Sequence, residues 1–237
     1  MDIRRFGVTV AFLLSVASPI AAQQPAAPGG TDHVAAVKQS LAQSAAALRQ
    51  YQWVETTAVS IKGEEKSRTQ NTCYYGADGK VQKTPIAAAP AADSKDKRGV
   101  RGKIVENKKE DISESAKEAV ALVKQYVPPD PARIQAAKDA GKLSVVPPDP
   151  QGRVQVVIKD YLKAGDSLTI DVNAATDVIS GVTVATFTDS AKDAVALKVT
   201  FGSLPDGTVY AAAIHLDVAV QKLAVAIENS GYKKAGS

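Results

Sequence analysis

The stretch VYAAAIHLDVAVQKLAVAIENSGY, residues 209–232, decides the fold of this chain. From residue 210 to residue 220, larger apolar residues alternate with smaller or polar ones, which is the period of a β-strand with one buried face. After Gln221 the alternation changes phase, and Leu223 and Val225 continue it on the new parity. Such a change predicts either a tight turn or a bulge near residues 221–222. The rest of the chain should then supply further strands for this sheet, or helices that cover its apolar face.

Other runs along the chain show the same alternation, and turn-forming residues such as the Asp-Gly pair at 78–79 separate them. In nearly every run one face is aliphatic, and the other carries alanine, hydroxyl or charged side chains, as in an antiparallel sheet with one covered face. The predicted strands cover residues 51–61, 67–75, 80–86, 154–159, 167–172, 182–186 and 194–201.

We therefore predict an α+β fold. Its centre is a strongly curved antiparallel sheet of about seven to nine strands, an incomplete β-barrel, with helices covering the concave face. The alternative is a sandwich in which two groups of strands face each other. The curved sheet is favoured because the amphipathic helices otherwise lack an apolar partner.

The first predicted helix follows Thr31 and Asp32, which are suitable N-cap residues, and runs to about residue 50. Its apolar residues are spaced three and four apart, as one face of a helix requires. We expect residues 31–237 to form a single half-barrel domain that includes this helix.

A second helical region interrupts the strand series. Helical periodicity begins at Asp111, Pro128-Pro129 stops it, and Asp130-Pro131 is a typical start for another short helix. We interpret residues 111–146 as a helical insertion that covers the sheet as a lid.

Residues 1–22 have the features of a secretory signal peptide, namely an early charged segment, a short apolar run and small residues at the end. We expect cleavage near Ala22; the alternative is an uncleaved anchor helix, which Pro19 disfavours. Residues 23–30, QQPAAPGG, read as a flexible linker. No other segment is apolar enough to cross a bilayer, so we expect a periplasmic or otherwise exported protein with no transmembrane segment after cleavage.

Residues 87–109 lose all periodicity and carry many charges, so we predict a mobile, exposed loop. The basic residues within 95–109 could dock an envelope protein or lipid head groups, or they could simply be solvated. The whole chain has 29 basic and 25 acidic residues, mixed along its length, for a formal net charge of +4. Basic stripes with interleaved aromatics are absent from the sequence, which argues against nucleic-acid binding.

The sequence gives no sign of a catalytic or metal site. His33 and His215 lie in different predicted elements without cysteine or carboxylate spacing for zinc. There is no G-x-S-x-G motif, and Cys73, the single cysteine, has no identifiable base near it in sequence. We therefore predict a protein that is not an enzyme and has neither a catalytic residue, a metal nor a cofactor.

The layout of nearly the whole mature chain resembles the LolA-like family. The resemblance rests on the signal peptide, the helix ahead of strands beginning Tyr51-Gln52-Trp53, the short helical insertion, and a final strand ending Glu228-Asn229-Ser230-Gly231-Tyr232. The family contains periplasmic lipoprotein carriers and related lipid-binding proteins built as an incomplete β-barrel with a helical lid. The resemblance implies that acyl chains are held between the concave sheet and the lid.

A site for an acyl chain needs apolar lining and no reactive group, since each buried methylene contributes roughly 0.8 kcal/mol. For every candidate lining residue, ordinary core packing is the alternative explanation. The candidates are Trp53, Val120, Val123, Tyr126, Phe201, Ile214, Leu216 and Val225.

Two functions follow from the sequence. The first is an exported, non-catalytic binder or carrier of a hydrophobic ligand such as an acyl chain, a lipid or a lipoprotein. The alternative is a structural or protein-interaction module of an envelope assembly, which would use a sheet edge or the 87–109 loop and have no small-molecule site.

Overall fold

The computed structural model describes residues 30–86 and 114–235, with side chains described from residue 39 onward in the first helix. The predicted signal peptide, almost all of the 23–30 linker and the 87–109 loop lie outside the described residues. The helices are α1 (Gly30–Ala47), its 3-10 extension η1 (Leu48–Gln50), a helix that contains residues 114–123, and α3 (Pro131–Asp139). The strands are β1 (Tyr51–Ile61), β2 (Glu64–Tyr75), β3 (Val81–Pro85), β4 (Leu143–Val146), β5 (Arg153–Lys159), β6 (Ser167–Asn173), β7 (Val178–Phe187), β8 (Ala194–Ser203), β9 (Val209–Val218) and β10 (Leu223–Lys234).

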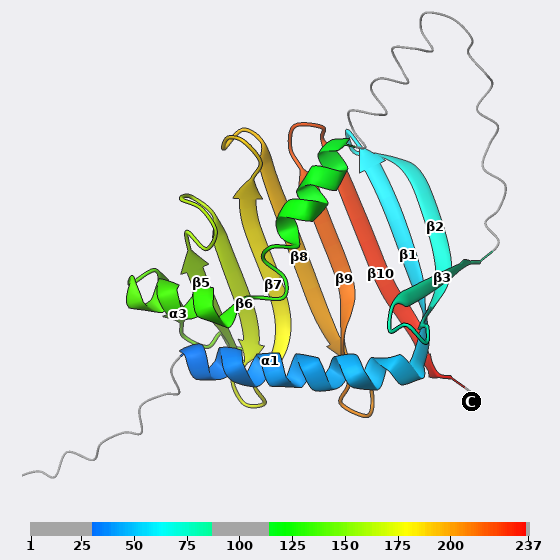
Figure 1. Cartoon of the computed structure of the whole chain (residues 1–237), viewed down its shortest axis with the longest axis horizontal. Coiled ribbons are helices and arrows are strands. Elements are labelled where there is room, and N and C mark those ends of the chain that lie inside the picture. The colour runs from blue at the N-terminus through cyan, green and yellow to red at the C-terminus, as the bar shows by residue number, and fades with distance from the viewer. Residues whose placement is uncertain (1–29, 87–113, 236–237) are drawn as a thin grey trace, which may run out of the picture.

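All ten strands belong to one antiparallel sheet, with the order β3-β2-β1-β10-β9-β8-β7-β6-β5-β4. The first strand pairs with the last, and β3 and β4 form two open edges, so the strands that the structure describes make an incomplete barrel (Figure 1). The predicted α+β class with a curved antiparallel sheet is confirmed, and the sandwich alternative is wrong because there is one sheet.

The change of phase near residue 221 is a tight turn between two paired strands. The Lys222 N–H donates to the Ala219 carbonyl at 3.1 Å, and Lys222 has a left-handed φ of 48°. Leu223 and Val225 then lie opposite Val218 and Leu216, so the large residues of β9 and β10 share one face of the sheet. The opening stretch of sequence is therefore a β-hairpin.

The aliphatic residues form continuous rows across the sheet, because each cross-strand pair brings like side chains together. One row runs from β5 to β1 through Ile158, Leu168, Val184, Leu197, Leu216, Val225 and Val59. The neighbouring row consists of Val156, Ile170, Val182, Val199, Ile214, Ile227 and Thr57. These rows are the sheet side of the core.

The helices lie against this apolar face. α1 crosses the ends of the strands, α3 lies beside β5, and the 114–123 helix crosses over the middle of the sheet (Figure 1). Ala119 and Val123 of the 114–123 helix and Ile134 of α3 are buried in the same core as the strand residues. The Ser44 hydroxyl of α1 accepts the backbone N–H of Val209 at 3.0 Å, which joins α1 to the start of β9.

The end of the predicted helical insertion was wrong, because it forms a strand, β4. Residues 143–146, which end the predicted 111–146 insertion, pair with β5 instead of belonging to the lid. The preceding α3 starts as predicted, because Asp130 caps it by accepting the Ala132 N–H at 2.9 Å. A run of four residues between Gly141 and Pro147 is too short for its alternation to be recognised. The sheet accordingly has ten strands and not seven to nine.

Candidate functional site

The helices cover the apolar face of the sheet unevenly. In the row that starts at Ile158, the residues on β5 to β9 are at most 7% exposed, whereas Val225 on β10 and Val59 on β1 are only partly buried. The neighbouring row behaves alike, since Val199 on β8 is 6% exposed and both Ile214 and Ile227 are partly buried. The partly buried aliphatic side chains therefore form one patch on β9, β10 and β1, which we call the half-covered face; it consists of Ile214, Val225, Ile227 and Val59.

The predicted lining residues divide into three groups. Val123, Tyr126 and Leu216 are buried in the closed part of the core. Phe201, Ile214 and Val225 are partly buried residues that border it on β8, β9 and β10. Ile214 and Val225 belong to the half-covered face, whereas Phe201 lies opposite Ala211, further along β9.

The other two candidates, Trp53 and Val120, lie apart from that border. Trp53 is buried among tyrosines further along β1. Val120 is 37% exposed on the flank of its helix. It borders a shallow groove of about 440 Å³, which is lined by Ala116, Lys117, Val120, Ala121 and Lys124.

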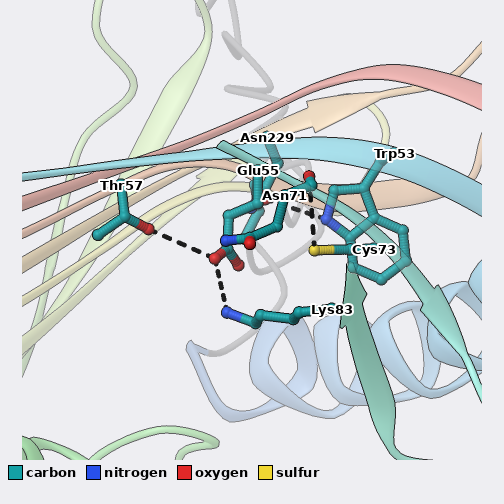
Figure 2. Close-up of polar contacts among 8 residues, drawn as sticks. Trp53, Glu55, Thr57, Asn71, Cys73, Lys83 and Asn229 are labelled. Atoms are coloured by element: carbon teal, nitrogen blue, oxygen red, sulfur yellow. Dashed lines mark hydrogen bonds and ion pairs between the residues drawn. The ribbon is translucent and has the colours of Figure 1, made fainter. Parts of the chain in front are cut away.

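The face of β1 that carries Val59 continues into a polar cluster. Glu55 is only 8% exposed, and its carboxylate accepts a hydrogen bond from Lys83 of β3 at 2.5 Å and one from Thr57 at 3.3 Å (Figure 2). Asn71 of β2 and Asn229 of β10 lie opposite Glu55 on the two neighbouring strands. A buried carboxylate on an otherwise apolar face is costly unless it is paired, so Lys83 compensates the charge of Glu55.

Beyond the polar cluster, aromatic residues gather at the end of the same face. Trp53 stacks on Tyr232 with ring centroids 5.6 Å apart, and its indole N–H donates to Asn229 at 3.1 Å. Tyr75 and Tyr210 pack against this pair at centroid distances of 5.7 Å from Trp53 and 4.4 Å from Tyr232, respectively. Along β1 and β10 the face thus changes from aliphatic to polar to aromatic.

An ion-paired carboxylate closes the aromatic end. The Tyr51 hydroxyl donates to Asp206 at 2.5 Å, and Lys234 lies 3.9 Å from the same carboxylate. The hydrogen bond from Tyr51, followed by those from Thr208, lowers the pKa of Asp206 from 3.8 to about 2. Asp206 therefore remains charged at any pH at which the protein is expected to work.

The 114–123 helix is anchored to the sheet at its C-terminal end. The Tyr126 hydroxyl donates to Asp166 at 2.5 Å and lies 2.7 Å from the Thr186 hydroxyl, and all three residues are buried. Asp166 also accepts backbone N–H groups, including that of Tyr161 at 2.6 Å. Burial, and then the hydrogen bond to Asp166, raise the pKa of Tyr126. Tyr126 is thus a structural anchor as well as a member of the core.

The described residues contain no group of three or more histidine, cysteine, aspartate or glutamate side chains that could hold a metal ion. Cys73 is fully buried beside Trp53, and burial raises the pKa of its thiol. A buried thiol in its neutral form is a poor nucleophile. His215 points to the outer face of β9 and is exposed, as its position in the alternation predicts.

Sequence reasoning missed Glu55, Lys83, Asn229 and Asp206. One signal was available in the sequence. Glu55 alternates with Trp53 and Val59, so its carboxylate is predicted to lie on the same face of the strand as these large apolar residues. Partners 28 and 176 residues apart, as in the contacts of Glu55 with Lys83 and of Trp53 with Asn229, could not be found from one sequence.

No helix in the part of the chain that the structure describes has the length and apolarity needed to span a membrane. No protein-family model matches the sequence, and no curated protein does either.

Solved structures that are similar to this chain at low identity include the following three. A LolA superfamily protein from Nitrosomonas europaea is 10% identical, with a TM-score of 0.36 over 85% of this chain and 94% of its own. A DUF1329 family protein from Desulfovibrio piger is 7% identical, with a TM-score of 0.37 over 87% and 93%. MucB, in a complex with MucA(peri), is 9% identical, with a TM-score of 0.24 over 86% and 100%. The first belongs to the superfamily that the sequence resembles, and because every TM-score is below 0.5 we draw no functional conclusion from these likenesses.

Proposed function

We propose that this chain is an exported, non-catalytic binder or carrier of a hydrophobic ligand, with an acyl chain lying on the half-covered face. The observation that supports the proposal is the uneven burial along the aliphatic rows. Leu168 and Val184 are fully buried, whereas Val225 and Val59 in the same row remain partly exposed. Partly exposed aliphatic side chains that adjoin one another give an apolar ligand a surface on which to pack.

The energetics of such a site are sufficient. Burying ten methylene groups contributes roughly 8 kcal/mol before ordering costs, because each contributes about 0.8 kcal/mol. A dissociation constant of about 1 μM requires a net free energy of about 8 kcal/mol, so more than ten methylene groups have to be buried to offset the ordering and association costs. The aliphatic residues of β9, β10 and β1 and the 114–123 helix provide the apolar lining without any reactive group.

The test begins with the full chain, exported and purified without detergent. Native mass spectrometry should show retained lipid, and the delipidated protein should bind a 16-carbon acyl probe saturably. We would use palmitate and 1-palmitoylglycerol in displacement titrations. If neither probe binds and no lipid is retained, the half-covered face is ordinary core surface and the proposal is wrong.

A matched pair of substitutions locates the site. Ile227→Asn places an amide on the half-covered face, and Ala226→Asn places the same group on the opposite face, since neighbouring strand residues point to opposite sides. We expect Ile227→Asn to weaken binding of the acyl probe roughly tenfold, at a cost of about 1.4 kcal/mol, and Ala226→Asn to leave it unchanged. Circular dichroism of both variants verifies the fold.

One observation favours the interaction-module alternative. β4 is an edge strand, and two of its valines, Val145 and Val146, are 45% and 42% exposed. An exposed apolar edge can accept a strand from a partner. In that case Val145→Lys with Val146→Lys should abolish a specific envelope complex, and neither acyl probe should bind the unaltered protein.

A further inference from the structure

We infer that the ligand of the half-covered face has a polar end that donates hydrogen bonds and carries no negative charge, and that Glu55 accepts those hydrogen bonds. The inference rests on the proposed function and specifies its ligand class. It follows from the position of Glu55 and from the unequal burial of Glu55 and its partner Lys83.

Glu55 lies where the polar end of a bound chain would be. Glu55, Thr57 and Val59 alternate along β1 and share the face that Val225 joins from β10. Four residues along a strand separate Glu55 from Val59 by about 13 Å at 3.3 Å per residue. An acyl chain that lies over Val59 and Val225 and runs along β1 therefore brings its head group to the polar cluster.

The two partners of the ion pair differ in their freedom to move. The side chain of Glu55 is 11% exposed and that of Lys83 is 48% exposed. Lys83 comes from β3, one of the two edge strands, and all residues of β3 are exposed. The carboxylate is therefore the fixed charge of the site, whereas the ammonium group can turn into water once another donor takes its place beside Glu55.

This asymmetry decides which head groups fit. A hydroxyl, an amide N–H or an ammonium group can approach Glu55 beside Lys83 or in its place, and the buried carboxylate keeps a partner. An anionic head group has to recruit Lys83, which leaves Glu55 buried without its counter-charge and adds a second negative charge beside it. The site thus favours neutral or cationic donors and rejects carboxylates and phosphates.

The test compares head groups on one acyl chain. Palmitate and 1-palmitoylglycerol are titrated at pH 8, where palmitate in solution is ionised, into the delipidated full chain. We expect the glycerol ester to bind at least roughly tenfold more tightly. Equal affinities, or tighter binding of palmitate, would overturn the inference while leaving the proposed function intact. Absence of binding by both probes would instead contradict the proposed function.

Two substitutions test the roles of the pair. Glu55→Gln keeps the size of the side chain and its contact with Thr57 but removes the charge. The ratio of the affinity for the glycerol ester to the affinity for palmitate should therefore fall to about one, because palmitate binds more tightly to this variant. Lys83→Met should weaken the binding of palmitate below that of the unaltered protein and leave the binding of the glycerol ester unchanged. If Lys83→Met abolishes binding of palmitate and palmitate is the better ligand of the unaltered protein, Lys83 is an anion-binding residue and the inference is wrong. Because the comparison with the unaltered protein requires no variant, it holds even if one substitution prevents folding.

Discussion

Replacing Tyr126 with phenylalanine tests the anchor of the 114–123 helix. The substitution keeps the ring in place and removes one hydroxyl, so it creates almost no cavity. The lost contacts are the hydrogen bond to the Asp166 carboxylate at 2.5 Å and the contact with the Thr186 hydroxyl at 2.7 Å. Tyr126 has one hydroxyl proton, and this proton forms the hydrogen bond to the Asp166 carboxylate. The Thr186 hydroxyl is therefore the donor in the second contact.

The magnitude follows from the chemistry of these groups. A hydrogen bond to a charged group contributes about 1.5–3 kcal/mol, and leaving Asp166 and Thr186 buried with one partner fewer adds to the loss. We expect the free energy of unfolding to fall by about 2 kcal/mol. For a domain of this size that fall lowers the melting temperature by about 4–8 °C. Tyr126→Ala should cost more, about 3–5 kcal/mol, because it also leaves a cavity.

Urea denaturation followed by the fluorescence of Trp53, the single tryptophan, measures the effect. The midpoint should fall while the slope against urea stays constant, which marks a change in stability and not in compactness. Tyr74→Phe is the matched control, because Tyr74 is 43% exposed and its substitution should change stability by less than about 0.5 kcal/mol. If Tyr126→Phe behaves like this control, the buried contact does not anchor the helix.

Three further changes test other parts of the structure. The lowered pKa of Asp206, about 2 against 3.8, means that its stabilisation is complete above pH 4 and is lost as the pH falls toward 2. Asp206→Asn should reduce the dependence of the melting temperature on pH over this window. The same substitution at the exposed Asp189 should leave that dependence unchanged. Ser44→Ala deprives the buried Val209 N–H of its acceptor and should cost about 1–3 kcal/mol in urea denaturation. Gly231→Ala forces alanine into a φ of 64° and should lower stability by about 1–2 kcal/mol; an unchanged midpoint would contradict the strained geometry.

The sequence predicts those parts of the fold that local patterns encode. The alternation of residues 209–220, continued at Val225, predicted which face of β9 and β10 carries the large apolar side chains. The pairing of Leu216 with Val225 confirms that prediction. The Asp130-Pro131 pair predicted the start of α3, because a capping side chain and a proline act within one turn.

The features that depend on distant packing were not predictable. Whether Ile214 is covered depends on where the 114–123 helix crosses the sheet, and no residue near Ile214 encodes that position. The compensation of Glu55 depends on Lys83, two strands away. β4 consists of four residues, and only its pairing with β5 distinguishes it from a loop. The candidate site was therefore predicted in its apolar character but not in its polar end.

Intermolecular nuclear Overhauser effects test the central claim most directly. The full chain, with labelled isoleucine, leucine and valine methyl groups, would be measured with unlabelled 1-palmitoylglycerol. The proposed site predicts contacts from the acyl chain to Ile214, Val225, Ile227 and Val59, and none to the fully buried Leu168. Contacts confined to Val120 in the outer groove, or an absence of contacts at saturating ligand, would contradict it.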